Sequence, residues 1–204
     1  MKTDSYNRVF KNSPMCIVLI AINFLIYLLI KGMPWEVDLL ALHVNPTMTI
    51  QRPWTLITSF FVHDAGIHIM GTMLIVFYAG SKLEIVVGSR KIAKIFLISG
   101  LSGSLVFLFA SMLLGQMDMA VGASAAALGI LGSSVMVPLE DINRSLSVKK
   151  IIIVVTITNL FMLIFNRWQF AASTLAHFSG MLTGMGLGYW IKKQMPVPVL
   201  KKDN

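Results

Sequence analysis

Charged side chains are scarce in this chain. Asp, Glu, Lys and Arg together make up 13% of its 204 residues, whereas a soluble domain carries roughly 25%. Hydrophobic residues account for 56%, and they gather in runs long enough to cross a bilayer. The scarcity of charge therefore excludes an ordinary soluble domain and indicates an all-α polytopic membrane protein.

Cysteine and recognisable metal-binding motifs are also nearly missing. Cys16 is the single cysteine, which excludes an intrachain disulfide. The sequence has no HExxH motif, and no intramembrane carboxylate is placed to act as a base. The histidines His63, His68 and His177 could together hold a zinc ion, and this alternative stays open. We expect no metal and no other cofactor.

Six apolar runs are predicted to cross the membrane within one membrane domain. The predicted spans are Pro14–Ile30, Ile67–Val87, Ile92–Leu114, Val121–Val137, Lys150–Phe165 and Ala171–Ile191. They make residues 14–191 the helical core, between a cytoplasmic segment 1–13 and a cytoplasmic tail 192–204. The connection between the first two spans is rich in apolar residues and tryptophan, so we expect it to lie in the membrane interface.

The positive charges follow this topology. The chain has a net charge of +8, and 14 of its 17 Lys and Arg residues fall in cytoplasmic segments if the N-terminus is inside. The positive-inside rule therefore predicts that both termini are cytoplasmic. We expect the basic residues to contact lipid headgroups, and we expect no nucleic-acid partner. The sequence predicts no particular oligomeric state.

Two polar side chains, Ser124 and His177, lie near the outer ends of the fourth and sixth spans. At 1.5 Å per residue, the serine lies roughly 7–8 Å and the histidine roughly 10 Å below the outer face. Both groups are costly in lipid unless they have partners inside the bundle. As a pair they would be a nucleophile and its general base. Taken alone, Ser124 could also be a packing residue that bonds a backbone carbonyl.

Two further features concern the second and sixth spans. His63 and His68 lie near the outer end of the second span, either as interfacial residues or as part of the same site. Gly180, Gly184 and Gly188 recur at intervals of four in the sixth span. Such a ridge of small residues predicts tight packing against another helix.

The ordered set of motifs resembles the rhomboid family of intramembrane serine proteases, in its minimal six-span prokaryotic form. The motifs are His63-x4-His68, the GxS of Gly122–Ser124, AHxxG at Ala176–Gly180, and Ser81-Lys82-Leu83-Glu84 followed by Gly88. The resemblance runs from about Gln51 to Trp190. It implies a six-transmembrane-helix rhomboid-like bundle with a membrane-embedded first loop, in a prokaryotic cell membrane.

The resemblance also implies roles for individual residues. Ser124 would be the nucleophile and His177 the general base. His68 would donate to the oxyanion together with the backbone N–H of Ser124, and Gly122 would allow a close approach at the helix start. His63 and Thr72 would support the site.

Several positions depart from the family's usual pattern. Thr72 stands where the family commonly has Asn, which implies weaker oxyanion stabilisation. Ala125 replaces a frequent Gly, and Leu128 replaces an aromatic residue that packs on the catalytic histidine. The Trp-Arg pair of the family's first loop is here Arg52-Pro53-Trp54.

Three functions are compatible with this pattern. A serine endopeptidase would cleave transmembrane segments of other membrane proteins near the outer leaflet. A non-proteolytic relative would bind transmembrane helices without cutting them. A small transporter is the third alternative, although the two halves of the chain show no internal repeat.

Overall fold

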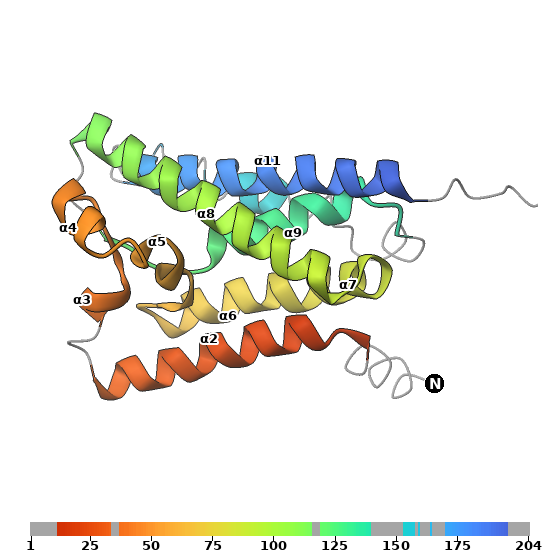
Figure 1. Cartoon of the computed structure of the whole chain (residues 1–204), viewed down its shortest axis with the longest axis horizontal. Coiled ribbons are helices and arrows are strands. Elements are labelled where there is room, and N and C mark those ends of the chain that lie inside the picture. Colours follow the sequence, from red (N-terminus) through yellow and green to blue (C-terminus); the bar gives the residue numbers. More distant parts are fainter. Residues whose placement is uncertain are drawn as a thin grey trace, which may run out of the picture.

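The computed structural model describes residues 12–33, 37–115, 119–139, 153–157, 159, 164 and 170–195. Within these ranges the chain is an all-α bundle with one short pairing of two strands (Figure 1). Three helical stretches are long and apolar enough to cross a membrane, namely Pro14–Gly32, Gly66–Val87 and Ser89–Leu114. The protein is therefore an integral membrane protein.

The elements follow one another in a simple order. They are α2 (Pro14–Gly32), α3 (Val37–Leu40), β1 (Leu42–His43), α4 (Pro46–Gln51), α5 (Thr55–Thr58), η2 (Ser59–Phe61), α6 (Gly66–Ile75), the π-helical η3 (Val76–Gly80), α7 (Ser81–Val87), α8 (Ser89–Leu114), β2 (Met119–Ala120), α9 (Ser124–Met136) and α11 (Ala171–Gln194). Here α6, η3 and α7 form one continuous stretch, which is the predicted second span.

The first, second, third and sixth predicted spans agree with these helices to within a few residues. The fourth begins at Ser124 and not at Val121, because the chain turns at Gly122, whose φ is 104°. The fifth predicted span, Lys150–Phe165, lies largely outside the described residues, as do most of segments 1–13 and 192–204. The count of six spans therefore stays a prediction.

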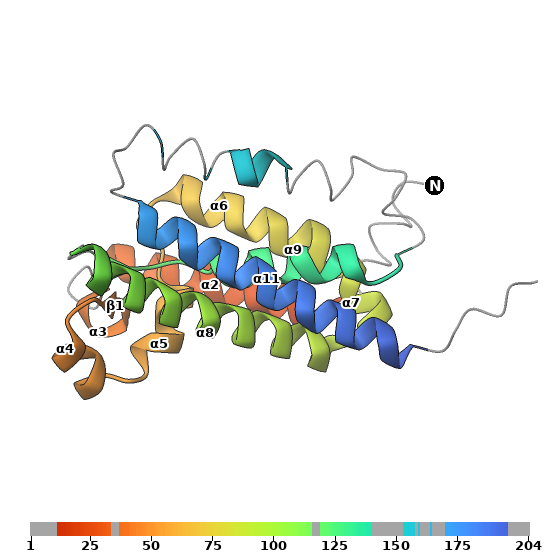
Figure 2. The same ribbon diagram turned by 90° about the horizontal axis from the view of Figure 1, so that it is seen from above.

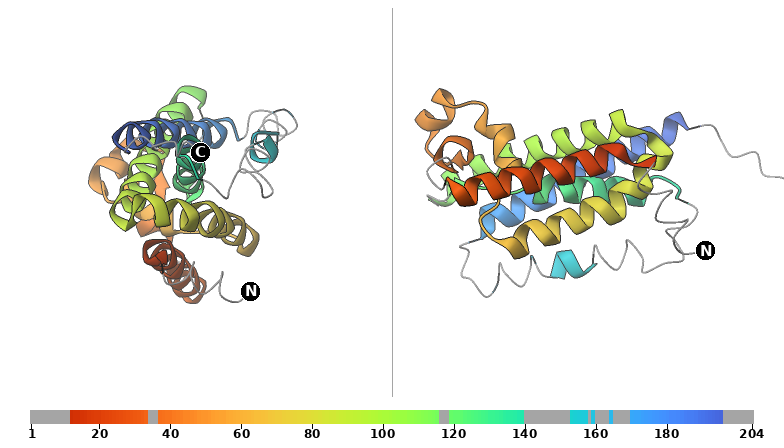
Figure 3. Two further views of the ribbon diagram at one scale, coloured as in Figure 1. Left: turned by 90° about the vertical axis from the view of Figure 1, so that its right-hand side faces the viewer. Right: turned by 90° about the horizontal axis from the view of Figure 1, so that it is seen from below.

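Helix α9 lies in the middle of the bundle. It packs against α8 and α11 on one side and against α6, η3 and α7 on the other (Figures 1 and 3). A Cβ added to Gly180, Gly184 or Gly188 of α11 would meet the backbone of α9. The α9 residues at these three points are Ala125, Gly129 and Ser133, in the same order. Both helices thus use a four-residue repeat of small residues for their contact.

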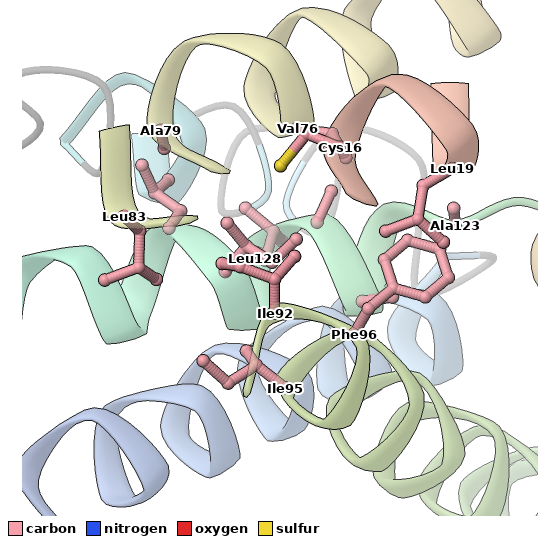
Figure 4. Packing of buried hydrophobic residues seen from close by; sticks show 14 of the residues in the cluster. Cys16, Leu19, Val76, Ala79, Leu83, Ile92, Ile95, Phe96, Ala123 and Leu128 are labelled. Atoms are coloured by element: carbon pink, nitrogen blue, oxygen red, sulfur yellow. The ribbon is translucent and has the colours of Figure 1, made fainter. Parts of the chain in front are cut away.

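The largest cluster of buried side chains surrounds this central helix. Figure 4 shows residues of α2, η3, α8 and α9 meeting in it, among them Cys16, Val76, Phe96 and Leu128. Leu128, at the position where the family often has an aromatic residue, is 4% exposed. This position therefore contributes to the core around α9.

The first loop, between α2 and α6, is folded on itself and lies at one end of the bundle (Figure 2). Arg52 Nη1 donates to the carbonyl of Asp38 at 2.9 Å, and Trp54 Nε1 donates to that of Leu39 at 3.0 Å. The Arg-Pro-Trp segment thus anchors the loop to α3. The antiparallel pairing of β1 with β2 was not predicted, and it ties the loop to the residues just before Ser124.

Candidate functional site

Ser124 and His177 lie side by side in the bundle. Ser124 is the first residue of α9, and His177 lies in the second turn of α11. The serine Oγ is 2.7 Å from His177 Nε2, which is hydrogen-bonding distance. The close contact between the glycines of α11 and the backbone of α9 allows this approach, because bulkier residues would hold the two helices apart.

A cavity of about 460 Å³ opens beside this pair. Its lining includes Ser59, His68, Gly122, Ser124 and His177. The volume falls in the range of ligand-binding sites, roughly 300–1,000 Å³. The serine and the histidine therefore both line an open cavity.

His68 joins the site through two contacts. Its Nδ1 is 2.8 Å from Asp64 Oδ1. Its opposite edge faces Gly122, where an added Cβ would lie 2.6 Å from His68 Cε1 and 2.7 Å from Nε2. Glycine is thus required at position 122 for two reasons. Its φ is positive, and a Cβ would collide with the imidazole of His68.

Asp64 was missed by the sequence analysis. Burial alone would raise the pKa of the Asp64 carboxyl, but the hydrogen bond and charge of His68 outweigh it and hold this pKa below its usual range. The four-residue spacing of Asp64 and His68 was the available signal, because it suits a side-chain pair at the start of a helix.

His63 supports the turn that carries Ser124. The side chain is buried, at 1% exposure, and its Nε2 accepts a hydrogen bond from the backbone N–H of Ala123 at 3.4 Å. The neighbouring N–H of Gly122 donates to the carbonyl of Ser59 at 2.8 Å. His63 is not among the residues that line the cavity. Its contacts therefore stabilise the turn at Gly122 and Ala123, which precedes Ser124.

The buried state of His63 predicts a pH-dependent stability. Burial, followed by the nearby His68, lowers the pKa of His63 to about 4, against an ordinary value of about 6.5. The unfolded chain therefore binds a proton at His63 that the folded chain does not, so stability is lost as the pH falls from about 6.5 towards 4. The loss attributable to His63 is up to about 3 kcal/mol.

The midpoint of thermal unfolding, measured between pH 7.5 and 4.5, checks this prediction. His63→Gln keeps an amide oxygen that can accept from Ala123 but does not titrate, so its midpoint should fall less steeply with acid than that of the unmodified protein. Parallel curves for the two proteins would contradict the role given to His63.

Thr72 does not face the cavity. Its Oγ1 donates to the carbonyl of His68 at 2.9 Å, one turn earlier in the same helix, and the residue is 5% exposed. It is not among the residues that line the cavity. The resemblance to the family implied that Thr72 supports the site, but the rotamer directs its hydroxyl to the helix backbone.

Asn159 is the second residue that the sequence analysis missed. Its Oδ1 is 2.6 Å from His177 Nδ1, on the side of the ring opposite Ser124. The available signal was a polar amide inside the apolar run of the predicted fifth span, where such residues are rare. In the described part of the chain, no group of three or more His, Cys, Asp or Glu side chains converges as a metal site.

A family model and several curated relatives match most of this chain. The family model for the rhomboid domain matches residues 51–194. The RHOMBOID-like protein 6, mitochondrial, of Arabidopsis thaliana is 32% identical over 147 residues, covering 69% of this chain and 44% of its own length. RHOMBOID-like protein 2 of the same plant is 31% identical over 140 residues, covering 67% and 41%.

A protozoan relative is similar to a comparable extent. Rhomboid-like protease 3 of Toxoplasma gondii is 27% identical over 157 residues, covering 74% of this chain and 56% of its own length. The chain thus spans about half or less of the length of these relatives. The matched region nevertheless includes the whole cavity and both helices that meet there. The chain belongs to the rhomboid family.

Proposed function

We propose that this protein is a serine endopeptidase that cleaves transmembrane segments of other membrane proteins near the outer leaflet. The observation that carries the proposal is the 2.7 Å contact between Ser124 Oγ and His177 Nε2 beside a cavity. A serine hydroxyl is a weak nucleophile unless a neighbouring base removes its proton during attack. His177 is within reach of that proton.

The reaction would proceed in two stages. Ser124 Oγ attacks the scissile carbonyl carbon while His177 Nε2 takes the hydroxyl proton. His177 then gives this proton to the leaving amine, and the acyl group stays on Ser124. Water, activated by the same imidazole, attacks the ester and releases the second fragment, which returns the serine to its starting state.

Negative charge develops on the carbonyl oxygen during each attack. The first turn of α9 supplies backbone N–H groups without intrahelical partners, and the positive end of the helix dipole lies there. A hydrogen on Nε2 of His68, the ring nitrogen opposite the contact with Asp64, would add a further donor. Donors aimed at such an oxyanion are typically worth about 3 kcal/mol each.

The positions of Ser124 and His177 in their helices support cleavage near the outer leaflet. Ser124 and His177 lie near the N-terminal ends of α9 and α11. The distribution of Lys and Arg predicts that both chain termini are cytoplasmic, so these helix ends would be close to the outer face. The proposed membrane is a prokaryotic cell membrane, the proposed partners are substrate helices and lipids, and no nucleic acid is involved.

The test is cleavage in a defined membrane. The purified protein is reconstituted in liposomes with a single-span reporter that carries small, helix-breaking residues near one end. We expect two fragments, whose cut site mass spectrometry places near the outer end of the reporter helix. A fluorophosphonate should stop cleavage and leave its adduct on Ser124. An intact reporter, or an adduct on another residue, would refute the proposal.

One observation favours a second function, the binding of transmembrane helices without cleavage. Thr72 directs its hydroxyl to the backbone of its own helix and not to the cavity, so the oxyanion loses a donor that the family commonly supplies from this position. In this case the reporter would copurify with the protein but stay uncut, and no adduct would form.

A further inference from the structure

The side chain of Asn159 holds the far side of the His177 ring. Asn159 Oδ1 is 2.6 Å from His177 Nδ1, and Asn159 Nδ2 donates to the carbonyl of Val155 at 2.8 Å. His177 Nε2, at the opposite corner of the ring, is 2.7 Å from Ser124 Oγ. The four residues therefore form one chain of hydrogen bonds that ends at the serine hydroxyl.

This chain of hydrogen bonds has a single direction. The carbonyl of Val155 can only accept, so it must face the NH₂ group of Asn159, and the amide oxygen must then face the imidazole. An amide oxygen also only accepts, so His177 Nδ1 carries the hydrogen. A neutral imidazole has one N–H, which leaves the lone pair of Nε2 for the proton of Ser124.

We propose that Asn159 is a positioning residue that fixes the tautomer and the ring orientation of His177, so that Nε2 is always ready to accept the serine proton. The inference rests on the proposed function, which needs His177 as a base. Without Asn159 the ring could carry its hydrogen on Nε2, and that tautomer cannot take a proton from Ser124. Asn159 itself is not among the residues that line the cavity, and its contact with the site runs through His177.

Asn23 provides a matched control elsewhere in the bundle. It is a buried asparagine in α2, and its Nδ2 donates to the carbonyl four residues earlier, Leu19, at 2.7 Å. Asn159 makes the same bond to Val155. Among the described residues, however, the Oδ1 of Asn23 has no hydrogen-bond partner. Comparing the two asparagines therefore separates the contact with His177 from the general effect of removing an amide that bonds its own helix backbone.

The experiment combines two measurements on the full-length protein in detergent micelles. Nitrogen-15 spectra of histidine-labelled protein report which ring nitrogen of His177 carries hydrogen, and His177→Gln assigns the signal by its disappearance. The rate of labelling by a fluorophosphonate reports the activation of Ser124. In that reaction Oγ bonds to phosphorus, fluoride leaves, and His177 Nε2 takes the serine proton.

We expect the unmodified protein to show hydrogen on Nδ1 of His177. Asn159→Leu should move it to Nε2 in a substantial fraction of molecules and slow labelling about 10- to 100-fold, since a misdirected base loses part of the general-base contribution. Asn159→Asp keeps an oxygen acceptor of the same size, so it should retain the Nδ1–H tautomer and label within about tenfold of the unmodified protein. Asn23→Leu should leave the tautomer unchanged and the labelling rate within about twofold.

The two measurements distinguish failure of this inference from failure of the proposed function. If the unmodified protein is labelled but Asn159→Leu changes neither the tautomer nor the rate, the positioning role of Asn159 is wrong. If the unmodified protein shows the Nδ1–H tautomer, and Asn159→Leu shifts it, but no serine is labelled, Asn159 positions His177 and the proposed protease activity fails. If Asn23→Leu slows labelling as much as Asn159→Leu, the effect is structural and the inference is overturned.

Discussion

Replacing Ser124 with alanine is expected to lower the rate of helix cleavage by about 10⁴-fold or more, and replacing His177 with alanine should do the same. The two groups act as a unit: the Oγ attacks only when Nε2, 2.7 Å away, takes its proton. Losing either member of such a pair therefore costs nearly as much as losing both, and the remaining rate comes from substrate binding and oxyanion stabilisation. The double variant should accordingly be no slower than either single variant.

A control for this prediction lies on the same helix. Ser134 is another serine of α9, here buried, and its Oγ donates to the carbonyl of Leu131 at 2.7 Å. Ser134→Ala should keep reporter cleavage within about fivefold of the unmodified protein, because it removes one hydrogen bond far from Ser124 and such a bond contributes about 1 kcal/mol. Reporter cleavage in liposomes measures all variants, with thermal unfolding as a check on folding. Normal cleavage by Ser124→Ala would rule out the proposed nucleophile.

Alanine substitutions at two glycines of α11, two residues apart, should have different effects on the free energy of unfolding. At Gly184 an added Cβ would overlap the backbone of Gly129 in α9, where no flexible side chain can move aside. At Gly186 an added Cβ would meet nothing within 4 Å. We expect Gly184→Ala to destabilise the fold by at least about 3 kcal/mol, at the upper end of overpacking effects. Gly186→Ala should be neutral or stabilise by up to about 1 kcal/mol through helix propensity.

Thermal unfolding in one detergent measures both variants. The midpoint for Gly184→Ala should fall by roughly 6–12 °C, given about 2–4 °C for each kcal/mol in a protein of this size. Its cleavage rate should fall as well, because α9 carries Ser124 and α11 carries His177, and separating these helices lengthens the contact between them. Equal midpoints for the two alanine variants would contradict the backbone contact between α9 and α11.

The positions of four membrane helices could be predicted from the sequence to within a few residues. Apolar runs predicted α2, the α6–α7 stretch, α8 and α11, because lipid requires every backbone group to be paired within its own segment. The start of α9 was misplaced by three residues, because the hydropathy of Val121 carries no information about the turn at Gly122. The pairing of β1 with β2 involves only two residues in each strand, too short for a periodic signal.

Some residues of the candidate site could likewise be found from the sequence, and others could not. Ser124 and His177 stand out in the sequence as polar residues in apolar runs, and the rise of a helix predicts similar depths for them. Asp64 and Asn159 were missed although each lies within 2.8 Å of a histidine nitrogen. The role expected of Thr72 depended on its rotamer, which directs the hydroxyl to the carbonyl of His68.

The sequence by itself thus determined the membrane class, the helices α2, α6–α7, α8 and α11, the ridge of small residues on α11 and the two residues that could form a nucleophile and its base. These properties depend on local composition and on the fixed rise of a helix. Only the tertiary structure decided that Gly184 meets Gly129, that Asp64 and Asn159 each hold a histidine, and that Thr72 faces away from the cavity. Such contacts depend on how helices cross and on which rotamers their packing allows, and residues far apart in the chain settle both together.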